Sequence, residues 1–480
     1  MLTTLLLILY IAIILTVAVI IINTSTPPKA IAYLFLLIFF PIGGIIIYLT
    51  VGINHRTYKL YNKKLEVDKG IFIELKEQLK NYTKKTLSTS KVQLKHFYNL
   101  SKFIHQENVL TSNNKVSLLL NGEHKFPEVI KALKAAKNHI HIEYYIYQND
   151  TIGKQIGVIL KEKAAQGVKV RFIYDDFGSK DIRKSFVDSL IESGVEAYPF
   201  YKIKWLLLAN RINYRNHRKI IVVDGQVGFI GGVNVSDRYI NPNKFNCYWR
   251  DTHIKIEGLA VLNLQRVFLA DWNFCADQNV IVEEELFPID KQEITSDHNQ
   301  LVQVISSGPD SDHPDIMYAL IQAILLSKKE ILITTPYFVP RASFLDALKI
   351  ASLSGVSIKL LVPSVSDSKL VNGVSNSFYK EVLEIGVEVY RYKKGFVHAK
   401  TMIFDELISS VGTANLDERS FELNFEINAL VYDKELALQL KEAFLEDLRH
   451  SEKIDVKKWN SRSVFIRFAE RVARLLAPIL

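Results

Sequence analysis

The sequence predicts an α/β protein made of two copies of one α/β unit, preceded by a transmembrane hairpin of two helices. Three observations support this: two long apolar segments near the N-terminus, short apolar runs that alternate with amphipathic stretches from about residue 110, and two polar motifs with identical spacing. We divide the chain into a transmembrane hairpin (1–54), a helical connector (55–108) and two α/β domains (109–290 and 291–480).

The composition fits a membrane-anchored protein with a large core. The 480 residues have room for two or three domains, and 48% hydrophobic content is high for a soluble protein. The net charge of +9 is compatible with anionic lipid, with nucleic acid or with solubility alone. Cys247 and Cys275 fit no metal-ligand spacing and cannot form a disulfide framework, which favours a reduced, cytoplasmic catalytic region.

Residues 5–22 and 30–53 are the two apolar segments, the second interrupted only by Pro41 and a glycine pair. Each is long enough for a bilayer core of ~30 Å, which takes about 20 helical residues. The alternative is a cleaved signal peptide, but the chain lacks a basic start and a small-residue cleavage site. We therefore expect two spanning helices in the cell membrane.

The distribution of basic residues predicts the orientation of this hairpin. The turn between the segments carries only Lys29, whereas Arg56, Lys59, Lys63 and Lys64 follow the second segment. Basic residues concentrate on the cytoplasmic side of membrane proteins. The protein is thus expected to be multi-pass, with its catalytic domain in the cytoplasm.

The rest of the chain alternates strand-like and helix-like stretches, the pattern of an α/β protein. Two strand entries recur as Gly-Val pairs, at Gly167 and Gly194 in the first half and at Gly355 and Gly386 in the second. Such pairs are common in α/β loops, so the case for a duplication depends on the polar motifs.

A His-x-Lys-x4-Asp motif occurs twice, with glycine 14 and asparagine 17 residues after each histidine. The residues are His217, Lys219, Asp224, Gly231 and Asn234 in the first copy, and His398, Lys400, Asp405, Gly412 and Asn415 in the second. One match of this kind is a weak signal, and a lone copy would be read as a polar strand face. Two copies with the same downstream spacing are a strong signal.

Both motifs are apolar and β-branched or aromatic between their polar positions, so each is predicted to be a strand. Side chains two residues apart share a strand face, which places each lysine beside its histidine. Asp224 and Asp405 belong to the motifs, but they lie an odd number of residues further on, near the strand end. Their position favours a turn or structural role over direct participation in chemistry.

Asp224-Gly225 is a strong signal for a two-residue hairpin turn. That turn pairs Val223 with Gln226, so His217 falls opposite Gly232 and Asn234 lies one step further on the same face. Treating Asp405-Glu406 in the same way places His398 opposite Thr413, with Asn415 on the same side. The glycines are expected to leave room for a ligand to approach the backbone.

A cluster of histidine, lysine and asparagine suits a phosphodiester. Ammonium and amide donors stabilise the non-bridging oxygens, a neutral imidazole attacks phosphorus, and a protonated imidazole gives the leaving oxygen its proton. One motif supplies half of this chemistry, which explains the presence of two. A zinc site is a weaker alternative because adjacent lysines would repel the cation and no third ligand has suitable spacing.

These motifs resemble those of the phospholipase D superfamily, and the whole chain is similar to bacterial cardiolipin synthases. Further stretches that support the similarity are residues 142–145, 248–253, 335–340, 417–421 and 423–426. The resemblance implies two phospholipase D-like α/β domains in a pseudo-two-fold sheet sandwich, one active site at their seam, and no metal or organic cofactor.

The resemblance also implies roles for individual residues. It makes His217 the nucleophile and His398 the general acid, although the equivalent spacing of the motifs cannot order them. It implies that a carboxylate orients each histidine, and Asp251 and Glu426 stand at the matching positions. Ordinary loop acids or surface salt bridges are the alternative reading of these two carboxylates.

The implied reaction is reversible phosphatidyl transfer between two phosphatidylglycerol molecules in the membrane, giving cardiolipin and glycerol, with no nucleic-acid partner. The alternatives are a phospholipase D-type hydrolase, another phosphatidyltransferase such as a phosphatidylserine-type synthase, a membrane nuclease, and a non-enzymatic membrane scaffold. The sequence leaves the oligomeric state open.

Two further segments have an apolar face beside basic residues, residues 202–208 and a C-terminal helix. Phe465, Phe468, Val472, Leu475 and Leu476 of that helix follow helical spacing, with Arg467, Arg471 and Arg474 opposite. Both segments are expected either to contact the membrane or to pack against the catalytic region.

Overall fold

The computed structural model describes residues 2–23, 27–49, 97–104, 108–200, 214–242, 247–276, 283–289, 300–311 and 313–475, and a few residues between these ranges. Most of the predicted connector, and the loop at 202–208, lie outside the described residues. The end of the connector is helix α5 (Tyr98–Ile104), and its Phe97, Leu100 and Ile104 pack into the core of the second half.

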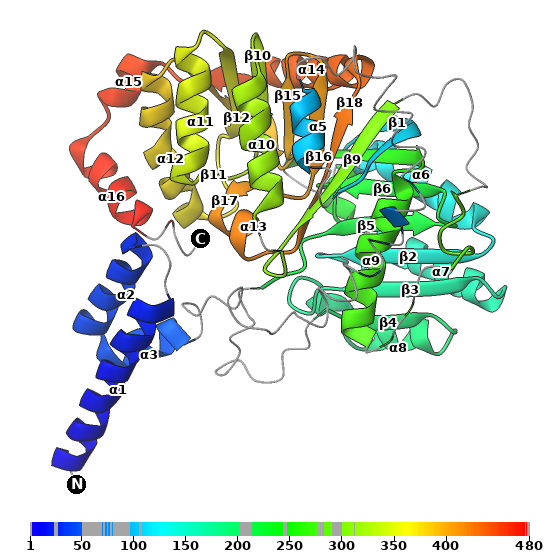
Figure 1. The fold of residues 1–480 in the computed structure, drawn as a ribbon, viewed down its shortest axis with the longest axis horizontal. Coiled ribbons are helices and arrows are strands. Elements are labelled where there is room, and N and C mark those ends of the chain that lie inside the picture. The colour runs from blue at the N-terminus through cyan, green and yellow to red at the C-terminus, as the bar shows by residue number, and fades with distance from the viewer. Residues whose placement is uncertain are drawn as a thin grey trace.

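The first apolar segment forms one long helix, α1 (Leu2–Asn23). Its stretch Thr3–Asn23, of 21 residues, is the one described helix that is long and apolar enough to cross a membrane. The Tyr48 hydroxyl donates to the Val19 carbonyl at 3.1 Å, so the two apolar segments pack against each other. The N-terminal region is therefore an apolar helical unit attached to the catalytic region (Figure 1).

The second apolar segment differs from the expected single spanning helix. It forms α2 (Pro27–Phe39) and α3 (Pro41–Ile47), separated by Phe40 in a non-helical conformation. A proline disfavours helical geometry in the residue before it, which explains the break at Phe40. Gly44 then lies so close to α2 that a Cβ would be 2.9 Å from the Leu37 backbone, so α3 folds back on α2. The predicted hairpin is thus present only in part.

The catalytic region contains one continuous sheet of 15 strands that runs through both halves. Its first half holds β1 (Leu110–Leu120), β2 (His139–Tyr144), β3 (Lys169–Tyr174), β4 (Glu196–Pro199), β5 (Lys219–Val223), β6 (Val227–Gly231) and β8 (Thr252–Gly258). Its second half holds β9 (Gln300–Ser307), β10 (Glu330–Thr334), β12 (Ser357–Pro363), β13 (Glu388–Tyr392), β15 (Thr401–Phe404), β16 (Ile408–Gly412), β18 (Glu426–Tyr432) and β19 (Ser451–Lys453).

The strand order confirms the duplication. The first half runs β1-β8-β6-β5-β2-β3-β4, and the second runs β9-β18-β16-β15-β10-β12-β13, with β19 added at its edge. In both halves the last three strands of this order are parallel and the others antiparallel. Antiparallel pairing of β1 with β9 joins the halves into one sheet.

The two halves of the sheet face each other across a shared apolar core. This cluster combines Ile220, Ile230 and Ile254 of the first half with Val411 and Ile427 of the second. Two further cores, one for each half, lie between the sheet and its helices. The layers are therefore helices, sheet, sheet and helices, the sandwich that the resemblance implied, and the helices at 261–276 and 434–449 also contribute side chains to the shared core.

The helices cover the sheet in the same order in both halves (Figure 1). In the first half they are α6 (Asn121–Ala135), α7 (Thr151–Ala165), α8 (Ser185–Ile191) and α9 (Val261–Ala276). In the second they are α10 (Asp315–Leu326), α11 (Ala342–Leu353), α12 (Lys369–Glu384) and α14 (Lys434–Arg449), followed by α15 (Val456–Asn460) and α16 (Val464–Arg474). Short 3-10 turns lie at Lys180–Ile182 and Asp237–Ile240.

The two motif hairpins are present, but their register differs by one residue from the prediction. Val223 pairs with Val227, and Phe404 pairs with Ile408. The expected turn bond exists, since the Gln226 N–H donates to the Val223 carbonyl at 3.0 Å. Gln226 is therefore an extra residue after the turn, a bulge that shifts the following strand by one position.

Candidate active site

Short parallel pairings between the halves bring the two motifs together. Just before His398, β14 (Gly395–Val397) pairs with β7 (Tyr248–Arg250) of the first half. Just before His217, Asn216 pairs with Phe425 of the second half. The His398 N–H donates to the Arg250 carbonyl at 2.7 Å, and the His217 N–H donates to the Phe425 carbonyl at 3.0 Å. Each histidine is thus fixed to the segment that precedes a carboxylate of the opposite half.

This crossing pairs each histidine with a carboxylate from the other half. His217 Nδ1 lies 2.9 Å from both carboxylate oxygens of Glu426, and His398 Nδ1 lies 2.7 Å from Asp251 Oδ2. Both carboxylates are fully buried, and both imidazoles are about one-tenth exposed. Because Nδ1 is held by the carboxylate, Nε2 is the nitrogen left for chemistry in both rings.

Both histidines line one cavity of about 450 Å³ at the seam between the halves. The cavity wall combines basic, acidic, amide and aromatic side chains. Its lining includes Tyr145, Arg215, Asn234, Arg238, Tyr239, Trp249, Tyr337, Asp367, Asn415, Asp417, Arg419 and Asn424. A single ligand can therefore contact both imidazoles.

The two motif lysines are buried beside this cavity rather than in its wall. Lys219 Nζ donates to the His217 carbonyl at 2.7 Å, and Lys400 Nζ makes the same bond to the His398 carbonyl. Burial lowers the pKa of Lys219 to about 7 and that of Lys400 to about 8. Their charges lie directly behind the imidazoles, where they favour an anion in the cavity.

Asn234 and Asn415 both line the cavity, as their shared spacing predicted. The Asn234 side chain already has two partners: its carbonyl accepts from the Ile146 N–H at 3.2 Å, and its amide donates to the Tyr239 hydroxyl at 2.9 Å. Asn415 Oδ1 is buried and has no hydrogen-bond partner among the described residues. The two amides are thus equivalent in place but differ in their surroundings.

Gly232, which follows the first motif glycine, and Gly412 of the second motif do not leave room for a ligand as expected. A Cβ on Gly232 would lie 2.1 Å from Asp251 Oδ1, and one on Gly412 would lie 2.2 Å from Asn428 Oδ1. The space beside them is filled by these side chains, not by a ligand. In the second half, Thr413 stands where the first has Gly232, and its hydroxyl donates to Glu426 at 2.5 Å. Gly232 therefore makes room for the carboxylate that holds His398, Gly412 makes room for the amide of Asn428, and Thr413 supports the carboxylate that holds His217.

Asp224 and Asp405 lie at the far ends of the motif strands, outside the cavity lining. The carboxylate of Asp224 accepts from the backbone N–H groups of 137, 138 and 139 at 2.8 Å. The carboxylate of Asp405 accepts in the same way from 328, 329 and 330 at 2.7–2.9 Å. Both aspartates tie the motif hairpin to the start of the neighbouring strand, a structural task.

We expect Asp224→Ala or Asp405→Ala to lower the free energy of unfolding by about 1–3 kcal/mol, because three backbone donors lose a charged acceptor. Turnover per folded molecule should stay close to that of the parent. Thermal unfolding and specific activity measure the two effects separately, with Asp346→Ala, an exposed residue paired with Lys349, as the control. A loss of turnover without loss of stability would assign these aspartates to the chemistry instead.

The electrostatics keep both imidazoles neutral and both carboxylates ionised. Burial lowers the pKa of His217 and of His398 to about 4, and the carboxylates offset this only in part. Burial alone would raise the pKa of Asp251 and Glu426, but the adjacent histidines and lysines outweigh it and hold both below their usual range. In the free protein at neutral pH, each ring is therefore a neutral base with Nε2 available.

These pKa values predict a bell-shaped dependence of kcat/KM on pH with its maximum on the acidic side of neutrality. The reason is that kcat/KM reports the free enzyme, in which His398 must gain a proton before it can act as the acid. Below about 4 the imidazoles become protonated and lose their nucleophilic lone pair. Above about 7–8 the lysines lose their positive charge, and an anionic phosphodiester binds more weakly. On the alkaline side, kcat should fall at a higher pH than kcat/KM does, because a bound phosphate stabilises the charged form of both lysines. Initial rates measured across this pH range at fixed lipid composition test the prediction. If kcat and kcat/KM fell at the same alkaline pH, the prediction would be wrong.

Several cavity residues were not identified from the sequence. Arg215 is buried, stacks on Phe177 at 4.8 Å, and has no hydrogen-bond partner for either terminal nitrogen among the described residues. Its counterpart in the second half is Phe396, whose ring lies 5.8 Å from that of His398. Arg215 has no sequence signal of this kind, because the motif comparison identifies only residues that are the same in both copies. Arg215 thus adds a guanidinium group to the cavity wall at a position where the second half has an aromatic side chain.

Comparison with known proteins agrees with this geometry. Residues 129–272 and 320–448 match the protein family described as cardiolipin synthase, PLD-like domain. The chain is 39% identical over 457 residues to a cardiolipin synthase of Geobacillus kaustophilus (strain HTA426), an alignment that covers 95% of this chain and 89% of that one. It is 38% identical over 454 residues to cardiolipin synthase 2 of Bacillus anthracis, covering 95% and 87%.

The fold has a solved relative. The crystal structure of phosphatidylserine synthase from Haemophilus influenzae Rd KW20 superimposes with a TM-score of 0.56 at 15% identity, covering 76% of this chain and 95% of that one. A duplicated sheet sandwich with two carboxylate-held histidines at its seam defines a phospholipase D-like phosphatidyltransferase that acts on phospholipid in a membrane. Within that class, the chain belongs to the cardiolipin synthase family.

Proposed function

We propose that this protein joins two phosphatidylglycerol molecules into cardiolipin and releases glycerol, by way of a phosphatidyl group held covalently on a histidine. The observation that carries the proposal is the pair of neutral imidazoles, each held through Nδ1 by an ionised carboxylate, on one cavity. Two equivalent nitrogen bases around one phosphorus suit a double displacement, in which one attacks and the other transfers the proton.

In the first step, Nε2 of His217 attacks the phosphorus of one phosphatidylglycerol. The phosphorus–nitrogen bond forms as the phosphorus–oxygen bond to the glycerol headgroup breaks. His398 takes up a proton from solvent as the anionic phosphodiester binds, because the negative phosphate raises the pKa of the ring, and then gives this Nε2 proton to the departing glycerol oxygen. Lys219, Lys400 and the asparagine amides stabilise the charge on the non-bridging oxygens. Glycerol leaves, and the phosphatidyl group remains on His217.

In the second step, the neutral His398 takes a proton from a glycerol hydroxyl of a second phosphatidylglycerol. The resulting oxygen attacks phosphorus, the phosphorus–nitrogen bond breaks, and cardiolipin forms as His217 regains its lone pair. Glu426 and Asp251 stabilise the imidazolium forms of His217 and His398 in turn. The two steps balance, since the proton given to glycerol is replaced by the proton of the second headgroup.

The test is purified full-length protein in vesicles that contain phosphatidylglycerol as the phospholipid substrate, with the products analysed by mass spectrometry. We expect cardiolipin and free glycerol in equal amounts. Phosphatidic acid as the sole lipid product would mean that water is the acceptor, and the protein would then be a phospholipase D-type hydrolase. An enzyme that needs a different alcohol would leave phosphatidylglycerol unchanged until that alcohol is added.

We further infer that both N-terminal apolar segments are embedded in the membrane and that the catalytic region lies in the cytoplasm. The support is the single Lys29 between the segments against four basic residues after them. Cys247 is exposed and reports the side directly. A membrane-impermeant maleimide should label it in inside-out vesicles and leave it unlabelled in intact cells. Labelling in intact cells would reverse the orientation.

A further inference from the structure

The last helix, α16, exposes a row of large apolar side chains to solvent. Phe465, Phe468 and Leu475 are 85%, 67% and 72% exposed, and Val464 and Val472 extend the same face. Their spacing of three and four residues places them on one side of the helix. An exposed apolar row of this kind normally marks a contact with another protein surface or with a membrane.

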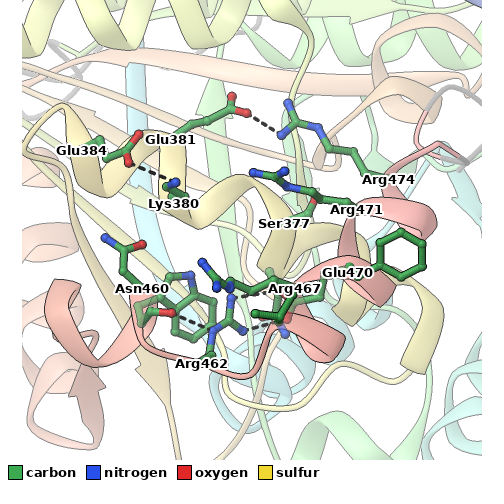
Figure 2. A pocket seen from close by; sticks show the side chains of 14 residues that line it. Ser377, Lys380, Glu381, Glu384, Asn460, Arg462, Arg467, Glu470, Arg471 and Arg474 are labelled. Carbon is green, nitrogen blue, oxygen red and sulfur yellow. Dashed lines mark hydrogen bonds and ion pairs between the residues drawn. The ribbon is translucent and has the colours of Figure 1, made fainter.

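Beside this row, α16 packs on α12 and borders a pocket of about 650 Å³ that is rich in arginine and that Val464 and Phe468 also line. Figure 2 shows Arg467 and Arg471 of α16 in this pocket together with Arg462, Arg474 and residues of α12. The lining holds five basic side chains and three carboxylates.

Three of the basic groups in this pocket are already neutralised. Arg462 forms two bonds to Glu470, at 2.7 and 2.9 Å, and stacks on Trp459 at 3.4 Å. Lys380 pairs with Glu384 at 3.5 Å, and Arg474 pairs with Glu381. Among the described residues, Arg467 and Arg471 have no carboxylate within 4.0 Å. The pocket therefore holds two uncompensated guanidinium groups, which suit an anionic phosphate.

The helix also leads toward the active site. Its last turn lies at the start of α12, where a Cβ on Gly373 would be 3.8 Å from Ala473. The neighbouring residues of α12, Ser368 and Val371, line the catalytic cavity. In Figure 1, α16 stands on the same side of the catalytic region as α1, α2 and α3. The exposed apolar row thus runs from the outer edge of the second half to the rim of the cavity.

We propose that α16 is an interfacial membrane helix: its apolar row enters the bilayer surface, and Arg467 and Arg471 bind phosphates of anionic phospholipids. An extended apolar surface would cover the apolar row, and negative charge would pair with the two free guanidinium groups beside it. An anionic bilayer supplies both, and α1 anchors the chain to a bilayer. Docking of α16 would hold the rim of the catalytic cavity against the lipid surface.

The test measures the depth of α16 in full-length protein carrying His217→Ala, so that turnover cannot alter the lipids. A Phe465→Cys change in a Cys247→Ser/Cys275→Ser background carries a fluorophore, because this background removes both native thiols. The nanodiscs contain lipids with a quencher near the headgroup. We expect strong quenching in discs that contain phosphatidylglycerol. The matched control is Leu353→Cys, 80% exposed at the end of α11 that lies away from the cavity, which should stay unquenched.

The arginines are tested by Arg467→Gln/Arg471→Gln in the same labelled protein. Each basic residue at an anionic surface contributes about 1 kcal/mol, so we expect the docking equilibrium to fall by about 30-fold in discs with phosphatidylglycerol. Lys349→Gln/Arg449→Gln removes the same charge from exposed positions outside this pocket and should change nothing.

Two results would overturn the proposal, and both are independent of catalytic activity. Equal, weak quenching at positions 465 and 353 would show that α16 stays in water. Protection of the label that depends on protein concentration in lipid-free detergent would show that a second copy of the chain covers the face. Because neither readout requires cardiolipin to form, failure of this proposal and failure of the proposed reaction are distinguishable.

Discussion

His217→Ala and His398→Ala should each reduce cardiolipin formation by at least about a thousand-fold, since each removes one of the two nitrogens around the phosphorus. Water cannot replace the histidine nucleophile in a transfer reaction, because the phosphatidyl group must first be held on a group that later leaves. Product formation from radiolabelled phosphatidylglycerol measures the loss. Parent protein quenched in an alkaline denaturant, in which the phosphorus–nitrogen bond survives, should carry the label on histidine, whereas the His217→Ala protein should carry none.

The same variants must be shown to fold. Both imidazoles are held in place by a buried carboxylate, so their removal leaves Glu426 or Asp251 without its partner. Thermal unfolding and the elution volume of the purified variant report this separately from activity. A folded variant with appreciable turnover at either position would exclude the two-histidine mechanism. Label found on the His217→Ala protein would exchange the roles of the two histidines.

Glu426→Gln should lower kcat by about a hundred- to ten-thousand-fold with a small change in KM. The amide has the shape of the carboxylate but no charge, so it neither fixes the tautomer of His217 nor stabilises its imidazolium form. Asp251→Asn should act in the same way on His398. Steady-state kinetics over a range of phosphatidylglycerol fractions separate the two constants.

Two further variants calibrate this result. Thr413→Val removes one hydrogen bond to Glu426 and leaves its charge, so its effect on kcat should be much smaller. Glu422→Gln removes a carboxylate that pairs with Arg341 outside the cavity and should leave kcat unchanged. If Glu426→Gln had no larger effect than Glu422→Gln, the carboxylate would have no part in catalysis.

Much of this arrangement could be predicted from the sequence, because it depends on local chemistry. Alternation with period two identifies the motif strands, and the distance from His217 to Asp224 spans one strand and its turn. The recurrence of the spacing at His398 shows the duplication without any knowledge of tertiary contacts. The structure confirms the strand order that such a repeat requires.

The features that escaped prediction depend on contacts between distant segments. Both carboxylates were identified, but nothing local to Asp251 indicates that it serves His398, 147 residues further along the chain. That pairing arises where β7 meets β14 across the seam. The purpose of Gly232 follows from the same contact, since the Asp251 carboxylate occupies the space beside it.

Smaller differences between the predicted and the observed structure have local causes, for which the same residues are compatible with more than one conformation. Asp224-Gly225 forms the expected turn, but a following bulge at Gln226 is compatible with the same residues. From the sequence, Pro41 is expected only to interrupt one spanning helix. In the structure the chain reverses there, because Gly44 permits contact between backbones that a side chain would prevent.

The antiparallel pairing of β1 with β9 has a consequence for how lipids enter and leave. The halves are joined by backbone hydrogen bonds at one edge and by a shared apolar core across their faces. A clamshell motion that opened the seam would break the ladder and expose that core to water. We therefore expect the seam to stay closed during turnover, so that lipid headgroups enter and leave through the opening of the cavity.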